Sequence, residues 1–186
     1  MAQVGTEQVT APPAGKWELD TAHTMVEFVA RHMLTKVRGR FTDFQGTIEI
    51  GEKPEDSSVT VEIRTNSIQT NQEMRDNHLR SSDFFEIETY ATITFRSTAV
   101  RLTGGNEFEL DCELTIKDVT NPVTLKGEFH GWGPDMEGTP VLFASAKTTV
   151  EREDWDLTWN VAVETGGFLV SKKVDLEIEV EAKKVG

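Results

Sequence analysis

Arg75, Asp76 and His78 form the densest group of side chains that are able to do chemistry. An arginine binds phosphate oxygens through its fork of N–H donors, and a histidine or an aspartate can transfer a proton. One interpretation is therefore a polar rim that contacts the polar end of a ligand. The other is that Arg75 and Asp76 pair locally and anchor a helix, because charged groups often serve geometry rather than ligand binding.

The other reactive side chains form no recognisable catalytic or metal-binding pattern. His23, His32, His78 and His130 are scattered and have no cysteine partner, so we predict no metal site. His32 is instead predicted to be a core histidine with satisfied hydrogen bonds. The single cysteine, Cys112, cannot form an intrachain disulfide, and its place on an apolar strand face predicts an unreactive thiol. We therefore predict no catalytic residues and no cofactor.

Strands are the main elements that position these side chains. Residues 107–116 place Phe108 and Leu110 on one face and acidic residues on the other, and residues 173–182 alternate in the same way. Because a charged residue stands at every second position, one face of each strand must lie in water. The same pattern predicts further strands at residues 17–32, 37–50, 57–68, 89–101, 121–132 and 141–151. Turns rich in Gly, Pro and Asn separate them, which predicts about eight antiparallel strands.

The segment 70–82 has the pattern of a short helix instead. Thr70 and Glu73 are spaced as a capping box. Met74 and His78 then fall on one face of the helix, one turn apart. We expect this helix to lie near one end of the sheet.

A sheet of eight one-sided strands is expected to close, because closure removes its edges. An eight-stranded barrel encloses either packed side chains or one small ligand. Small residues such as Ala30 and Gly127 are compatible with both interiors, so composition leaves the two open. Trp132, Trp155 and Trp159 are interpreted as a plug for the barrel end, with a lid that contacts ligand or membrane as the alternative. The large residues predicted to point inward are Phe28, Phe44, Ile63, Phe95, Phe108, Leu110, Leu114 and Phe129.

Composition limits the partners. The formal net charge of −13 excludes nucleic acid, which is bound by clustered Lys and Arg, and an anionic membrane would repel the same surplus. No apolar run approaches the ~18 residues of a spanning helix. Residues 1–15 lack the pattern of a signal peptide, so we predict a cytoplasmic protein. Residues 1–16 are predicted to be a flexible leader that joins no core, and residues 17–186 to be one barrel domain.

Several motifs together resemble the YceI-like, lipocalin-like polyisoprenoid-binding family. They are Trp17-Glu-Leu-Asp20 with His23-Thr24, Arg75-Asp76-x-His78-Leu79, Ser82-Asp83-Phe84-Phe85, Ile93-Thr94-Phe95, Glu113-Leu114-Thr115-Ile116, Asn121-Pro122-Val123-Thr124-Leu125 and the strand 174–182. They follow in order across nearly all of the chain after Lys16. The chain departs from the family pattern in two places. Ala91 stands where the family often has proline, and Asp154-Trp155-Asp156-Leu157 replaces its usual Asp-Phe-Gly-Leu.

The resemblance implies an all-β fold, an eight-stranded antiparallel lipocalin-like barrel that encloses a polyprenyl chain or an isoprenoid quinone. It implies a non-enzymatic carrier, with an enzyme that modifies the lipid through His78 or Asp76, or a ligand-free interaction module, as alternatives. The polar rim would comprise Arg75, Asp76 and His78. Independently of the resemblance, a barrel without free edges can form a homodimer through its outer face. The apolar tunnel would comprise the eight inward residues above together with Met74, Leu79, Phe84 and Phe85.

Overall fold

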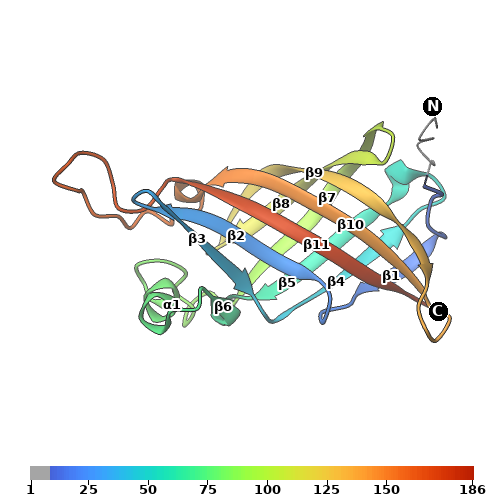
Figure 1. Ribbon diagram of the computed structural model, residues 1–186, viewed down its shortest axis with the longest axis horizontal. Helices are drawn as coiled ribbons and strands as arrows, with labels where there is room; N and C mark the ends of the chain where they lie inside the picture. Colours follow the sequence, from blue (N-terminus) through green and yellow to red (C-terminus); the bar gives the residue numbers. More distant parts are fainter. Residues whose placement is uncertain (1–8) are drawn as a thin grey trace, which may run out of the picture.

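The computed structural model describes residues 9–186, which form one antiparallel sheet curled into a barrel (Figure 1). A single α-helix, α1 (Glu73–Arg80), and three short 3-10 helices, η1 (Pro54–Asp56), η2 (Thr65–Ser67) and η3 (Arg152–Trp155), accompany the strands. The strands are β1 (Gly15–Leu19), β2 (Met25–His32), β3 (Thr35–Phe41), β4 (Phe44–Ile50), β5 (Ser58–Arg64), β6 (Ile68–Gln69), β7 (Thr92–Gly104), β8 (Glu107–Ile116), β9 (Val119–Pro134), β10 (Pro140–Glu151) and β11 (Lys173–Val185).

Eight of these strands make the closed ring. Their order is β1-β4-β5-β7-β8-β9-β10-β11, and β11 pairs again with β1. The second half of β11 pairs with β1, whereas its first half pairs with β2. β2 and β3 thereby continue the wall at the other end, where β3 also carries β6. The predicted eight-stranded antiparallel barrel is confirmed.

The first two strands predicted from the sequence, at residues 17–32 and 37–50, are each divided into two strands in the structure. The segment 17–32 bends between β1 and β2, because two groups at the bend bind one distant carbonyl. The backbone N–H of Asp20 donates to Glu181 O at 2.8 Å, and Thr24 Oγ1 donates to the same oxygen at 2.9 Å. Segment 37–50 is likewise divided between β3 and β4.

The barrel has two different ends, which we name by what lies there. The helix end carries α1, η3 and the β2–β3 turn, and the terminal end carries the start of β1, the β9–β10 turn and the C-terminus (Figure 1). The core cluster at the helix end contains Phe44, Ile63, Ile93, Leu114 and Trp155. The cluster at the terminal end contains Trp17, Ile48, Leu142 and Ala182.

Helix α1 is shorter than the predicted segment 70–82, and its cap differs. The side chain of Gln72 accepts a hydrogen bond from the backbone N–H of Arg75 and caps the helix. Thr70 does not, because its hydroxyl binds the carboxylate of Asp76 instead. Among residues 9–186, no helix has the length and apolar character needed to cross a bilayer.

His32 is exposed, so the prediction of a core histidine is wrong. It is the last residue of β2 and lies next to the β2–β3 turn, outside the barrel core.

Candidate functional site: an apolar cavity inside the barrel

A cavity of about 580 Å³ runs along the inside of the barrel. Its lining includes Phe84 and Leu157 at the helix end, and Pro12 and Asn106 at the terminal end. The volume lies within the range of small-molecule pockets, about 300–1,000 Å³. The alternative of a barrel filled by its own side chains is therefore wrong.

Most residues predicted to form an apolar tunnel do line this cavity. Those that lie on strands alternate with residues that are mostly charged or polar, as the period of two requires. Polar lining residues are few, among them Thr24, Ser57 and Arg152. Ten of the twelve predicted tunnel residues are in the lining: Phe28, Ile63, Leu79, Phe84, Phe85, Phe95, Phe108, Leu110, Leu114 and Phe129.

Phe44 and Met74 lie elsewhere. The ring of Phe44 is only 7% exposed and packs with Trp155 and its neighbours in the core cluster of the helix end, so the protein itself covers it. Met74 is 80% exposed, because it lies on the face of α1 that points to solvent. The helical spacing identified a face of α1 but did not reveal which face meets the barrel.

Two glycines determine where two of the lining phenylalanines lie. Gly39 stands opposite Phe28 across β2 and β3, and Gly127 stands opposite Phe108 across β8 and β9. A Cβ atom at Gly39 would lie 2.2 Å from Phe28 Cζ, and one at Gly127 would lie 2.2 Å from Phe108 Cζ. Each ring therefore lies directly over a glycine, which lets it fold against the wall and leaves the middle of the barrel open.

The helix end of the cavity is closed by η3 and the segment that follows it. The indole N–H of Trp155 donates to Leu114 O at 2.9 Å, and the side chain is 2% exposed. The ring of Trp159 packs against His78 and Phe84, with centroids 4.6 and 5.4 Å apart. Trp155 and Trp159 thus form the plug that the sequence suggested, whereas Trp132 is 37% exposed on β9, away from it.

Arg152 holds this closure together from inside. Its guanidinium donates to the backbone carbonyls of Ser171 at 2.9 Å, Leu157 at 2.5 Å and Trp159 at 3.0 Å. The side chain is 5% exposed and also lines the cavity. Burial lowers the pKa of Arg152 from its usual range, since desolvation disfavours the charged form.

At the terminal end the cavity is lined by loop segments, and no plug of tryptophan side chains like that of the helix end lies there among the described residues. Residues 11, 12 and 14, together with η1 and the β7–β8 turn, line the cavity there. The indole N–H of Trp17 donates to Pro13 O at 3.2 Å and fastens the segment to β1. The predicted leader 1–16 therefore joins the barrel from residue 9 onward, and residues 1–8 lie outside the described residues.

Comparison with known proteins identifies this architecture. The model of the YceI-like domain matches residues 17–182 of the chain. A UPF0312 protein of Staphylococcus aureus (strain N315) is 37% identical over 166 residues, which cover 87% of this chain and 94% of the relative. The chain belongs to the YceI-like family.

Solved structures with the YceI-like architecture agree with the barrel. The YCEI protein of Campylobacter jejuni has a TM-score of 0.73 at 25% identity and covers 84% of this chain and 90% of its own. BcnA of Burkholderia cenocepacia has a TM-score of 0.76 at 21% identity, with 88% and 98% covered. A polyisoprenoid binding domain from Saccharophagus degradans has a TM-score of 0.67 at 16% identity, with 91% and 98% covered.

The three residues of the predicted polar rim lie outside the cavity of this YceI-like barrel. Arg75 donates through Nε to Thr70 Oγ1 at 2.7 Å and through Nη2 to Thr70 O at 2.9 Å. Asp76 is 6% exposed, and its carboxylate accepts from the backbone N–H of Thr70 at 2.8 Å. His78 Nε2 lies 2.8 Å from Asp83 Oδ2. Arg75 and Asp76 anchor α1, as the structural interpretation held, but through Thr70 rather than through each other.

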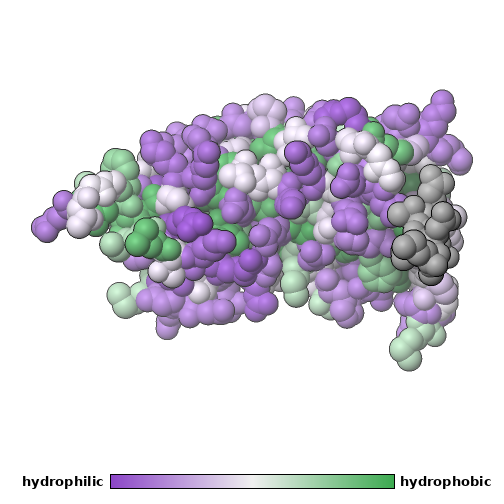
Figure 2. All heavy atoms as spheres, turned by 45° about the horizontal axis from the view of Figure 1, so that its top comes forward, coloured by the Kyte–Doolittle hydropathy of each residue, from purple (hydrophilic) through white to green (hydrophobic). Residues whose placement is uncertain are grey.

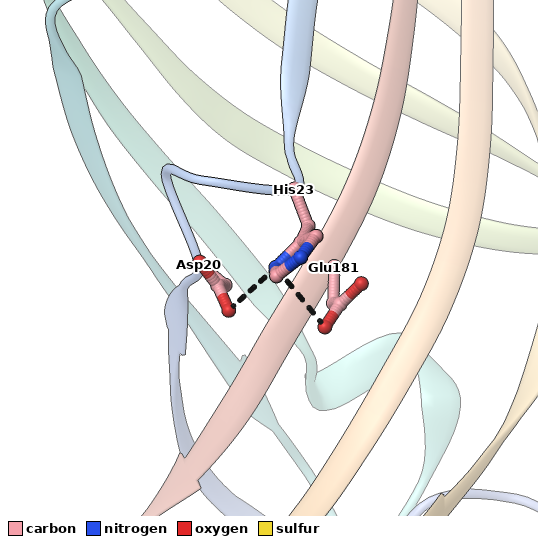
Figure 3. Close-up of side chains that lie close together, drawn as sticks. All are labelled: Asp20, His23 and Glu181. Atoms are coloured by element: carbon pink, nitrogen blue, oxygen red, sulfur yellow. Dashed lines mark hydrogen bonds and ion pairs between the residues drawn. The ribbon is translucent and has the colours of Figure 1, made fainter. Parts of the chain in front are cut away.

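Asp20, His23 and Glu181 come together at the bend between β1 and β2 (Figure 3). His23 Nδ1 lies 3.1 Å from Asp20 Oδ2 and 3.7 Å from Glu181 Oε1. The hydrogen bond with His23 lowers the pKa of Asp20 and, reciprocally, raises that of His23. The ligand atoms lie close enough to hold a cation, but Lys183 Nζ already lies 3.5 Å from Asp20 Oδ2. We interpret the group as an ion-pair network that fixes the bend.

The sequence analysis did not assign several residues that line the cavity of this YceI-like chain. Some of them could have been assigned from the strand pattern, and Arg152 could not. Leu176, Ile178 and Val180 of β11 line the cavity, and the alternation of that strand was sufficient to find them. Arg152 gave no signal, because nothing local distinguishes a buried arginine from the surface arginines of neighbouring strands. Cys112 is buried as predicted, and burial raises the pKa of its thiol to about 12.

Proposed function

We propose that this chain binds a long-chain isoprenoid lipid, such as a polyprenyl phosphate or an isoprenoid quinone, inside the barrel and carries or stores it without transforming it. The observation that supports this most is the apolar cavity, about 580 Å³ in volume, whose lining reaches both ends of the barrel. Such a space suits a long flexible hydrocarbon better than a compact polar molecule. The structural likeness to a polyisoprenoid binding domain adds support.

The energetics of such a site favour chain length over head group. A strand of ten residues is ~33 Å long, and barrel tilt leaves ~25 Å along the axis. At ~0.3 kcal/mol per heavy atom, each five-carbon unit contributes ~1.5 kcal/mol. Five buried units give ~7.5 kcal/mol, which corresponds to nearly micromolar binding. Longer chains must fold back or protrude.

Binding without chemistry is favoured over the enzyme alternative. The enzyme hypothesis assigned proton transfer to His78 or Asp76, and neither side chain lines the cavity. The carboxylate of Asp76 is already engaged by Thr70. A lipid within the barrel would therefore meet mainly hydrocarbon, with Arg152 as the nearest buried cation at the helix end.

Titration of delipidated protein with prenyl alcohols of increasing length tests the proposal. Affinity should rise about tenfold per five-carbon unit until the cavity is full. Ala146 lines the cavity on β10, and the next residue, Lys147, faces water. Ala146→Trp should weaken binding by about tenfold or more, whereas the matched variant Lys147→Trp should bind as wild type does. Equal affinities for the two folded variants, or no saturable uptake by wild type, would refute the proposal.

A further inference from the structure

Two segments far apart in sequence form a projection beyond the helix end of the barrel, which we call the tip. It consists of residues 31–36, around the β2–β3 turn, and residues 157–173 (Figure 1). The backbone N–H of Met33 donates to Leu169 O at 2.8 Å, and that of Ser171 donates to Arg31 O at 3.0 Å. The two segments therefore support each other as one structural unit.

The tip exposes large apolar side chains. Leu34 is 93% exposed, Phe168 57%, Met33 52% and Val161 47%. Figure 2 shows hydrophobic residues gathered at this end, next to the hydrophilic ones that cover much of the barrel side. Contiguous exposed apolar residues on a soluble domain mark an interaction surface.

The charge of the tip is opposite to that of the whole chain. The chain has 19 basic and 32 acidic residues, whereas the tip has four basic residues and one acidic residue, Glu164. Lys172 forms an ion pair with Glu153. Within residues 9–186, Arg31, Lys36 and Lys173 take part in no ion pair. Apolar side chains among basic ones are the composition that binds an anionic lipid surface.

The terminal end shows that exposed apolar residues alone do not give this combination. Around the β9–β10 turn, Met136 is fully exposed and Phe143 is 42% exposed. The charged residues beside them, Asp135 and Glu137, are both acidic. Lys183 of β11 already pairs with Asp135, with Nζ and Oδ2 3.7 Å apart, and the turn residues 135–139 contain no cation of their own, so this turn attracts an anionic bilayer less than the tip does.

The tip is also continuous with the cavity. Leu157 and Val170 of one tip segment line the cavity, as does Ala30, which immediately precedes the other. A bilayer that meets the tip would therefore lie next to the helix end of the cavity, where Trp159 and Phe84 form the closure.

We propose that the tip docks on an anionic lipid bilayer, with Leu34 and Phe168 inserted among the acyl chains and Arg31, Lys36 and Lys173 against the lipid phosphates. This goes beyond the proposed function, because it concerns a surface outside the cavity and requires no bound isoprenoid. It differs from the expectation from net charge that such a membrane repels the whole protein. Docking in this orientation would direct the helix end of the cavity toward the bilayer.

Co-sedimentation of the full chain with vesicles tests the docking surface. Wild type should bind vesicles of phosphatidylcholine mixed with phosphatidylglycerol, and raising the salt concentration should weaken binding. The double variant Leu34→Ser, Phe168→Ser should lose about tenfold or more in affinity. Met136→Ser, which removes an equally exposed apolar side chain at the terminal end, should bind as wild type does. Lys36→Gln should weaken binding about fivefold on the anionic vesicles and leave binding to pure phosphatidylcholine unchanged.

The proposal is overturned if wild type does not sediment with anionic vesicles, or if Met136→Ser loses as much affinity as the double variant. It is also overturned if the tip instead joins two copies, seen as a dimer that Leu34→Ser, Phe168→Ser converts to monomer without any vesicle binding. Uptake of a prenyl alcohol in detergent solution, measured on the same variants, should be unchanged. Failure of docking and failure of lipid uptake are therefore separate results.

Discussion

The two ends of the barrel are built on different principles, although one continuous sheet forms both. At the helix end, side chains close the cavity: Trp155 is fully packed, and Arg152 binds the carbonyls of the segment that follows. At the terminal end, loop segments around Pro12 and Asn106 line the cavity. The exposed residues are basic and apolar at the tip, whereas acidic residues accompany the apolar ones at the β9–β10 turn.

This difference indicates that the two ends of the barrel have different roles. The closure at the helix end depends on a few long-range contacts, so single substitutions there should open it. The terminal end is held by the strand register of β1 with β4 and β11, which spreads its stability over many backbone hydrogen bonds. We therefore expect the helix end to control ligand exchange and the terminal end to hold the barrel closed.

The largest effect is expected from the two buried tryptophans. Trp155→Ala and Trp17→Ala should each lower the free energy of unfolding by about 3–5 kcal/mol, since both side chains are fully packed. Only Trp155 lines the cavity, so only Trp155→Ala should also speed the release of a bound prenyl chain. Denaturant unfolding and a ligand-release assay check this. Equal release rates in the two variants would contradict the assignment of exchange to the helix end.

Arg152→Met should lower the free energy of unfolding by about 3 kcal/mol, because several buried carbonyls lose their donor. The matched variant is Arg101→Met, which removes an exposed arginine that pairs with Asp111 and Glu109. Its effect should be much smaller, because exposed ion pairs contribute little. Urea unfolding of both variants is the measurement. Similar losses of unfolding free energy in the two variants would show that the hydrogen bonds of Arg152 do not stabilise the closure of the helix end.

The strands were predictable where alternation alone determines them. β8 and β11 each have a charged residue at nearly every second position, so their inward faces could be assigned directly. The bend between β1 and β2 was not predictable, because Thr24 and Glu181, which fix it, lie 157 residues apart. The cap of α1 was misassigned for a similar reason. Thr70 has a better partner in Asp76 than in the helix backbone.

A smaller effect is expected from glycines in the wall. Gly39→Ala at the helix end should lower the free energy of unfolding by about 1–3 kcal/mol, because the new methyl group displaces the ring of Phe28. Gly133→Ala at the terminal end meets no heavy atom within 4 Å and should be neutral or slightly stabilising. Thermal unfolding compares the two. If Gly133→Ala were the more harmful change, the account of how Phe28 is positioned would be wrong.

The cavity itself was only partly predictable. Seven lining residues followed from residue type and strand face, and three more, Leu79, Phe84 and Phe85, were given with the family resemblance. An open interior, however, depends on pairs such as Phe28 with Gly39. Such pairs depend on strand register, which a single sequence does not supply. Phe44 was misplaced for the same reason, since packing against Trp155 depends on where η3 docks.

The smallest effect is expected at the bend between β1 and β2. The pKa of His23 is raised by the hydrogen bond with Asp20, so its stabilising contribution is complete below about pH 6.5 and disappears as the pH rises through the raised pKa. His23→Gln should therefore have a lower melting temperature than wild type at about pH 6, where histidine is protonated. The two melting temperatures should converge at about pH 9, where histidine is neutral. Melting curves across this range check the sign. A gap that widens toward alkaline pH would contradict the ion-pair network.

Native mass spectrometry of the protein purified without denaturant tests the central claim, that the barrel interior holds a lipid. Wild type should carry one added mass in the range of an isoprenoid lipid, which organic extraction removes. Ala146→Trp, which fills the middle of the cavity, should carry little or none, while Lys147→Trp retains it. Undiminished lipid on folded Ala146→Trp would contradict the claim, because the lipid would then bind outside the barrel.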